Sequence, residues 1–196
     1  MTQACALDSW SPGIGDPTIM GWVTVLVYIL AALVAAGAAR RAPFPIETQR
    51  RERAFWHILT VLLLALAVNK QLDLQSYMTA FARCMAKEQG WYQGRRVVQV
   101  SVILGLIAAM GLAGAVLWRM MRGTLARNGV ALVGMVFVLG FVAARAVGFH
   151  HMDALLKLEL QNIRLNWLFE LAGPILIIAA GLRLLRRQAS APRPAR

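Results

Sequence analysis

The sequence predicts an all-α integral membrane protein, a bundle of five transmembrane helices with its N-terminus outside and its C-terminus inside. The chain is 59% hydrophobic with a mean hydropathy of +0.58, whereas soluble proteins are about 45–50% apolar. Its apolar residues fall into five long runs, each close to the roughly 20 residues that a helix needs to cross a bilayer. The expected spans are residues 19–39, 54–73, 97–118, 129–148 and 165–184.

The charge distribution predicts this orientation. Three segments, residues 40–53, 119–127 and 183–196, hold thirteen of the 21 Lys and Arg but only two of the nine acidic residues. The positive-inside rule places these segments in the cytoplasm, and an odd number of spans puts the termini on opposite sides. The net charge of +12 therefore indicates topology and contact with anionic lipids, and it argues against nucleic acid as a partner.

The first 18 residues are expected to form a periplasmic arm ahead of the first span. Small residues at positions 35–39 resemble a signal-peptide cleavage site. However, Asp8 and Asp16 precede the span and no Lys or Arg does, which is the opposite of a signal peptide. The first span is therefore predicted to be an uncleaved helix.

The two cysteines are predicted to lie on the same side of the membrane. Cys5 is in the arm and Cys84 follows the second span, so the topology places both in the periplasm, where thiols are readily oxidised. We hypothesise a Cys5–Cys84 disulfide; the alternative is two unpaired thiols too far apart to bridge.

The second span becomes polar before it has crossed the bilayer. Its apolar stretch, residues 54–68, has only fifteen residues and is followed by Asn69, Lys70 and Asp73. Polar and ionisable groups at that depth are costly and usually face a bundle interior, a partner or water, so they are functional candidates. Apolar residues at three-to-four spacing over 74–87 predict that this helix continues beyond the membrane until Gly90 ends it.

The third and fourth spans carry small residues at helical spacing. Ser101 and Gly105 are four apart in the third span, as are Gly140, Ala144 and Gly148 in the fourth. Such residues allow helix backbones to approach closely within a membrane. They predict contact faces, either within this bundle or with a partner subunit.

Polar residues of three segments are expected to meet at the outer end of the bundle, where Arg145 would pair with Glu170 or Asp73. Asn162, Asn166, Glu170 and Gly173 would form one stripe along the fifth helix. The candidate catalytic residues are His150, Asp153, Glu170 and Asp73. The candidate ligand-binding residues are Asn69, Lys70, Arg145, Asn162 and Asn166.

The segment His150-His151-x-Asp153 is a candidate metal site, because imidazole and carboxylate are ligands of zinc and non-haem iron. Asp73 or Glu170 would supply a third ligand, and a water on the metal could be activated for hydrolysis. The alternative is a set of hydrogen-bonded interfacial groups.

This segment resembles the ceramidase-like membrane hydrolases, which also use His and Asp near one membrane face. That family has seven spans and distributes its ligands over separate helices. This chain has five spans and adjacent histidines, so no residue role is carried over from the resemblance.

Two functions of different class are consistent with these features. The first is a small bacterial inner-membrane protein acting as a binding or accessory subunit. Its polar end would be an ion-pair core or a lipid-headgroup site, and its partner would be a membrane protein or a second copy. The alternative is a metal-dependent membrane hydrolase acting on a lipid or another anionic amphiphile. Residues 188–196 are expected to form a disordered basic cytoplasmic tail.

Overall fold

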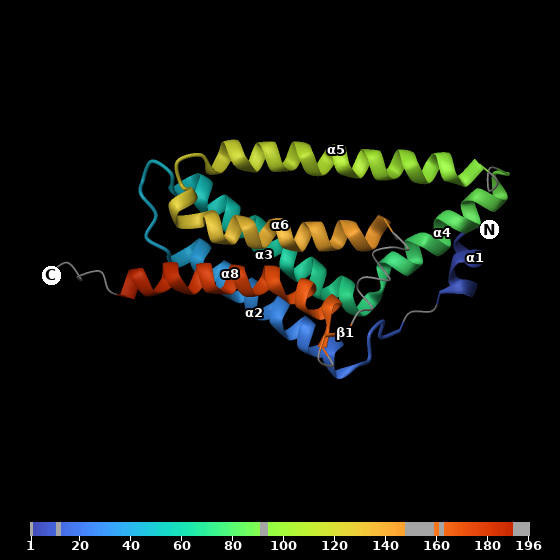
Figure 1. Ribbon diagram of the computed structural model, residues 1–196, viewed down its shortest axis with the longest axis horizontal. Helices are drawn as coiled ribbons and strands as arrows, with labels where there is room; N and C mark the ends of the chain where they lie inside the picture. Colours follow the sequence, from blue (N-terminus) through green and yellow to red (C-terminus); the bar gives the residue numbers. More distant parts are fainter. Residues whose placement is uncertain (1, 11–12, 91–93, 148–158, 161–162, 190–196) are drawn as a thin grey trace, which may run out of the picture.

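Five helices in the computed structural model are long and apolar enough to cross a membrane, which confirms the predicted all-α fold (Figure 1). The structure describes residues 2–10, 13–90, 94–147, 159–160 and 163–189. The five helices are α2 (Ile19–Arg41), α3 (Gln49–Leu72), α5 (Arg95–Met121), α6 (Leu125–Val147) and α8 (Leu165–Ala189). Which end of the bundle faces the cytoplasm stays a prediction.

The remaining elements are short. They are α1 (Thr2–Ser9), α4 (Leu74–Glu88) and two antiparallel strands of two residues each, β1 (Glu159–Leu160) and β2 (Ile163–Arg164). The strand pair precedes α8 directly and does not change the helical class of the fold.

Helices α2 and α3 pack small residues against large ones. Ala31, Ala35 and Ala38 of α2 are fully buried, and α3 contributes Trp56 and Leu59 to the same core. An alanine face lets the neighbouring backbone approach closely, and the large side chains of α3 fill the space that remains. This pair is the centre of the bundle.

Helices α6 and α8 meet at two glycines. A Cβ atom on Gly173 would lie 2.7 Å from the carbonyl oxygen of Gly134 and 2.6 Å from Val138 Cγ2. No side chain fits there, so glycine is required at this crossing. The helix contacts predicted at Gly140 and Gly105 are wrong for this bundle, because a Cβ on either would meet none of the described atoms within 4 Å. Spacing identified small residues, but it did not show which helix face turns inward.

Replacing Gly173 by Ala is expected to lower the free energy of unfolding by about 1–3 kcal/mol, because the added methyl overpacks the α6–α8 crossing. The matched control is Gly140→Ala on α6, where the methyl enters open space and removing a helical glycine is neutral or favourable. Unfolding in detergent followed by circular dichroism measures both. Equal stability of the two variants would contradict the crossing.

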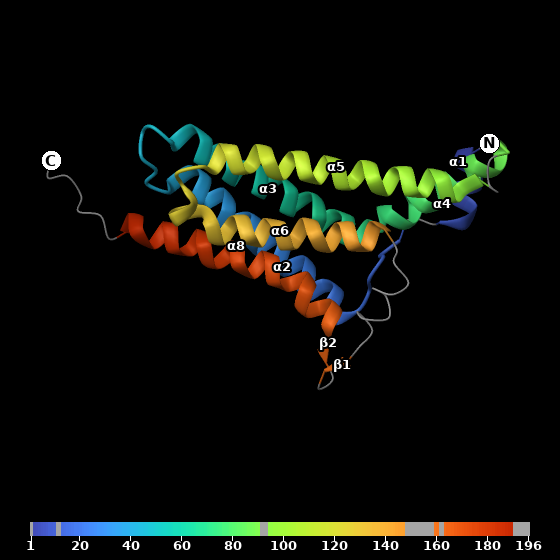
Figure 2. The same ribbon diagram turned by 45° about the horizontal axis from the view of Figure 1, so that its top comes forward.

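Helix α5 lies along the outside of the bundle in both views (Figures 1 and 2). None of the described residues in its most apolar window is buried. Its contact with the core is concentrated at its C-terminal end, where Met121 is fully buried and Leu117 and Met120 pack nearby. The apolar surface of α5 is therefore largely left uncovered by the rest of the bundle.

The second span does not continue as one helix, contrary to the prediction. Asp73 adopts a left-handed conformation with φ 46°, which ends α3 and begins α4 in a new direction. Gly90, at φ 74°, follows the end of α4, as predicted. The break turns α4 toward α1 at one end of the molecule (Figure 1).

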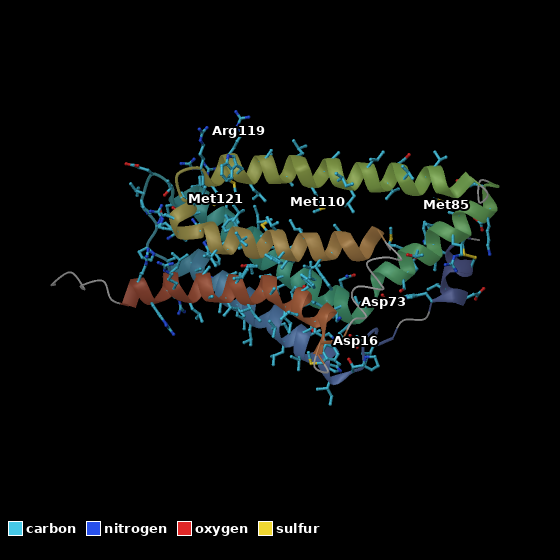
Figure 3. All side chains as sticks on the ribbon, viewed as in Figure 1. Asp16, Asp73, Met85, Met110, Arg119 and Met121 are labelled. Carbon is cyan, nitrogen blue, oxygen red and sulfur yellow. A yellow bond between two sulfur atoms is a disulfide. The ribbon has the colours of Figure 1, made fainter. Side chains whose placement is uncertain are left out.

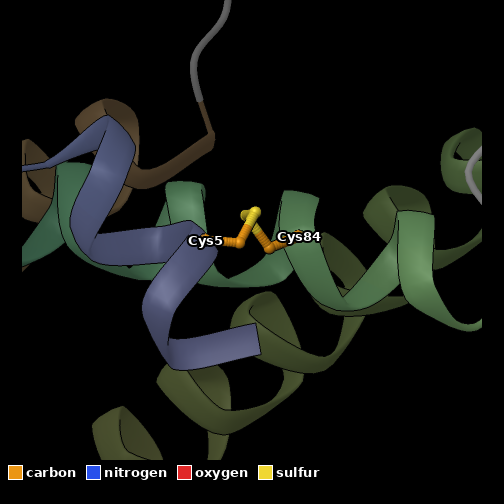
Figure 4. The surroundings of a disulfide bond; sticks show 2 residues. All are labelled: Cys5 and Cys84. Carbon is orange, nitrogen blue, oxygen red and sulfur yellow. A yellow bond between two sulfur atoms is a disulfide. The ribbon is translucent and has the colours of Figure 1, made fainter. Parts of the chain in front are cut away.

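Helices α1 and α4 are joined by the predicted Cys5–Cys84 disulfide (Figure 4). The Cα atoms of the two cysteines are 6.1 Å apart. The rings of Trp10 and Tyr77 make an edge-on contact nearby, with centroids 5.0 Å apart. The chain before α2 is thus fixed to α4 by a covalent bond and an aromatic contact.

Candidate functional site: a charged cavity at one end of the bundle

A cavity of about 620 Å³ lies at the end of the bundle where α2 begins and α3 ends. We call it the Lys70 cavity. Figure 3 shows Asp16 and Asp73 at this end, with Arg119 and Met121 at the opposite end. Its polar lining residues are Asp16, Thr18, Tyr28, Asn69, Lys70, Asp73, Ser76, Trp167 and Glu170. Its apolar lining includes Ile19, Met20, Leu66, Phe141 and Val142.

Lys70 connects two carboxylates from different parts of the chain. Its Nζ lies 3.0 Å from Glu170 Oε1 on α8 and 3.2 Å from Asp16 Oδ2 in the segment before α2. The exposed fraction of the side chain rises from 5% for Glu170 to 18% for Lys70 and 31% for Asp16. The ammonium therefore joins an inner, buried carboxylate to an outer, solvated one.

Asp16 is positioned by its local backbone. The Thr18 hydroxyl donates to Asp16 Oδ1 at 2.6 Å and caps α2 by accepting from the Gly21 N–H at 3.0 Å. The Gly15 N–H donates to the Gln71 carbonyl at 2.7 Å. Only glycine fits at position 15, because a Cβ there would lie 2.8 Å from Asp73 Cβ.

The pKa of Asp16 lies below its ordinary value of 3.8. Partial burial alone would raise this pKa, but hydrogen bonds from Thr18 and the charge and hydrogen bond of Lys70 outweigh that effect. A lowered pKa means that the stabilising contact is present above pH 3.8 and is lost as the pH falls through the lower, folded-state value. Asp16 therefore stays ionised at neutral pH.

The structure brings four of the predicted site residues to this cavity: Asn69, Lys70, Asp73 and Glu170. The described partner of Glu170 is Lys70, whereas the sequence predicted that Arg145 would pair with Glu170 or with Asp73. The helical position of Arg145 on α6 is described, but its side chain lies outside the described residues.

The predicted stripe of Asn162, Asn166, Glu170 and Gly173 is wrong only at its first member, because Asn166, Glu170 and Gly173 all belong to α8. Strand β2 occupies residues 163–164 and α8 begins only at Leu165, so the helical spacing does not extend back to Asn162. Asn162 itself and the side chain of Asn166 lie outside the described residues.

The predicted metal ligands His150, His151 and Asp153 also lie outside the described residues. Within the part of the chain that the structure describes, no group of three or more His, Cys, Asp or Glu side chains is arranged to hold a metal ion. Zinc or iron at His150, His151 and Asp153 stays a prediction.

Comparison with known proteins identifies no family for this chain. No protein-family model, curated protein or solved structure matches the chain. The function has to be inferred from the residues of the site.

A second polar cluster, which the sequence did not predict, lies at the opposite end of the bundle. Glu52 is fully buried there and accepts hydrogen bonds of 2.6 Å from Thr48, Arg127 and Asn128. Asn128 in turn accepts a 2.9 Å hydrogen bond from the Trp56 indole N–H. We call these five residues the Glu52 cluster.

The Glu52 cluster is structural. Both carboxylate oxygens of Glu52 are hydrogen-bonded, so the buried charge is paired and satisfied, and it connects the start of α3 to the start of α6. The sequence prediction missed it because it began this span at residue 54 and treated Glu52 as a loop residue. The available signal was the i, i+4, i+8 spacing of Thr48, Glu52 and Trp56, which places them on one helix face.

Asp16 was also missed as a site residue. The available signal was its position directly before the first span, at the same end as Lys70, with Thr18 two residues later as a helix cap.

Proposed function

We propose that this protein is a multi-pass protein of the bacterial inner membrane that binds the headgroup of a membrane amphiphile in the Lys70 cavity, as a binding or accessory subunit. The Lys70 end would face the periplasm. Two features support this orientation. Thirteen of the 21 basic residues lie in the segments predicted to be cytoplasmic, and the disulfide lies at the Lys70 end, as an oxidising compartment favours.

The observation that carries the proposal is the mixed lining of the cavity. Lys70 and Asp73 are at the end of α3, whereas Leu66 lies one helical turn further into the span, and Phe141 and Val142 line the cavity from α6. A fully polar ligand would leave these apolar walls in contact with water. An amphiphile, with a polar headgroup and an apolar tail, matches both kinds of wall.

The state of the charges favours binding over catalysis. Lys70 is held by two carboxylates. The pKa of Asp16 is lowered, so this carboxylate is not poised to exchange a proton near neutral pH. Paired groups of this kind can orient a headgroup by hydrogen bonding without taking part in a reaction.

Replacing Leu66 by Trp is expected to fill the apolar part of the cavity and reduce the amount of co-purifying phospholipid at least about tenfold, equivalent to about 1.4 kcal/mol of binding. The control is Leu64→Trp, the same substitution at an exposed position on the same helix. Mass spectrometry of lipid retained after extensive detergent washing measures both. Reconstitution with phosphatidylethanolamine, phosphatidylglycerol or phosphatidylcholine distinguishes the headgroups. Equal retention by both variants would contradict the proposal.

A further inference from the structure

One wall of the Lys70 cavity comes from outside the membrane-spanning helices. Gly15, Asp16 and Thr18 line the cavity, and all three belong to residues 13–18, which link α1 to α2. We call α1 together with residues 13–18 the arm. Access to the cavity therefore depends on where the arm lies.

The described polar contacts of the arm with the cavity are partly exposed. Asp16 pairs with Lys70 at 3.2 Å with its side chain 31% exposed. The Gly15 N–H donates to the Gln71 carbonyl, and Gln71 Nε2 donates to the Asp16 carbonyl at 3.5 Å. A solvated ion pair of this kind contributes little by itself, because water and side-chain entropy compete with it.

The disulfide adds a covalent constraint that holds the arm near the cavity. Cys5 is bonded to Cys84 of α4, and α4 follows α3 directly after Asp73. With α1 fixed there, the arm is anchored at both ends, by the disulfide at α1 and by the Thr18 cap at the start of α2, which raises the effective concentration of Asp16 at Lys70. Without the bond, the arm keeps its anchor at α2, and its α1 end is held by non-covalent contacts such as that of Trp10 with Tyr77.

We propose that the arm is a gate over the Lys70 cavity and that the Cys5–Cys84 disulfide keeps this gate closed. A dithiol reductant would then open the cavity. Regulation of lipid binding by this gate rests on the proposed function. Access to the cavity can be tested whether or not the cavity binds lipid.

The redox step is an ordinary thiol–disulfide exchange. A thiolate of the dithiol attacks the Cys5 sulfur, which is the more exposed of the two because Cys84 is buried. A mixed disulfide forms and Cys84 leaves as a thiolate, which takes up a proton. The second thiol of the reductant then attacks the mixed disulfide and releases Cys5. Two electrons pass to the cysteines, and the reductant leaves as a disulfide.

The test measures access to the cavity from water. Asn69, which lines the cavity, is replaced by Cys, and the rate of its modification by a charged maleimide is followed by site-resolved mass spectrometry. Labelling is compared with the disulfide intact and with Cys5 and Cys84 both replaced by Ala. Met78→Cys on the exposed surface of α4 is the control for general reactivity.

Loss of the disulfide is expected to speed labelling at position 69 about tenfold, with no change at position 78, because the arm loses its effective concentration at Lys70. Asp16→Asn with the disulfide intact is expected to give a smaller increase, and Asp8→Asn, the same charge change elsewhere on the arm, none. If the double alanine variant does not fold, dithiothreitol added to the already folded Asn69→Cys protein provides the open state.

Equal labelling at position 69 with and without the disulfide would overturn the gate. This outcome is separable from the fate of the proposed function. If Leu66→Trp still loses phospholipid, only the gate is wrong. If the labelling rate rises but Leu66→Trp retains as much lipid as Leu64→Trp, the gate stands and lipid binding fails.

Discussion

Replacing Arg127 by Met is expected to lower the free energy of unfolding by about 3–5 kcal/mol, because it leaves Glu52 buried and charged without its cation. Glu52 is fully buried while Arg127 is 28% exposed, so water cannot take over the role of the guanidinium. Denaturant unfolding in detergent micelles measures the loss. Arg122→Met, which removes an exposed arginine before α6, is expected to change stability by less than about 0.5 kcal/mol.

The double variant Glu52→Gln/Arg127→Met distinguishes a lost ion pair from lost packing. The glutamine amide is neutral and can still hydrogen-bond to Thr48 and Asn128, so most of the stability is expected to return. A double variant as unstable as Arg127→Met alone would show that the arginine acts through packing, and the interpretation of the Glu52 cluster as a charge pair would be wrong.

Replacing Lys70 by Met is expected to cost about 3 kcal/mol or more, since Glu170, with its side chain only 5% exposed, would be left buried without its cation. The two carboxylate partners of Lys70 should differ in how much each contributes to the free energy of unfolding. Asp16→Asn removes the solvated partner and is expected to cost less than about 1 kcal/mol. The same unfolding measurement compares all of these variants.

Lys70→Met/Glu170→Gln is expected to recover most of the stability lost in Lys70→Met, because no buried charge remains. If Asp16→Asn proved as damaging as Lys70→Met, the outer carboxylate would be the main partner of Lys70. The more buried carboxylate, Glu170, would then not be the partner of Lys70 that contributes more to the free energy of unfolding.

The sequence predicted the spans well, because length and hydropathy alone decide which helices can cross a bilayer. It also placed Asn69, Lys70, Asp73 and Glu170 at one end of the bundle, because each lies at the corresponding end of its own helix. A charge inside a membrane-spanning helix is costly, so an ionisable residue next to an apolar run is easily recognised in the sequence.

Pairing between helices could not be predicted in the same way. The partner of Glu170 depends on which helices are neighbours and how each is rotated, and the sequence alone predicted Arg145 for that role. The break at Asp73 had only a weak local signal, because Asp adopts the left-handed conformation more often than most residues other than glycine but still does so uncommonly. The contact at Gly134 and Gly173 likewise depends on helix rotation, which small-residue spacing does not fix.

The ion pair between Lys70 and Glu170 joins residues that are 100 positions apart, and Glu170 lies on α8, the last of the five spans. During synthesis, α3 enters the membrane long before α8 has left the ribosome. Lys70 therefore spends that interval without its inner carboxylate. The cavity is complete only after α8 has joined the bundle, because Trp167 and Glu170 of α8 line it.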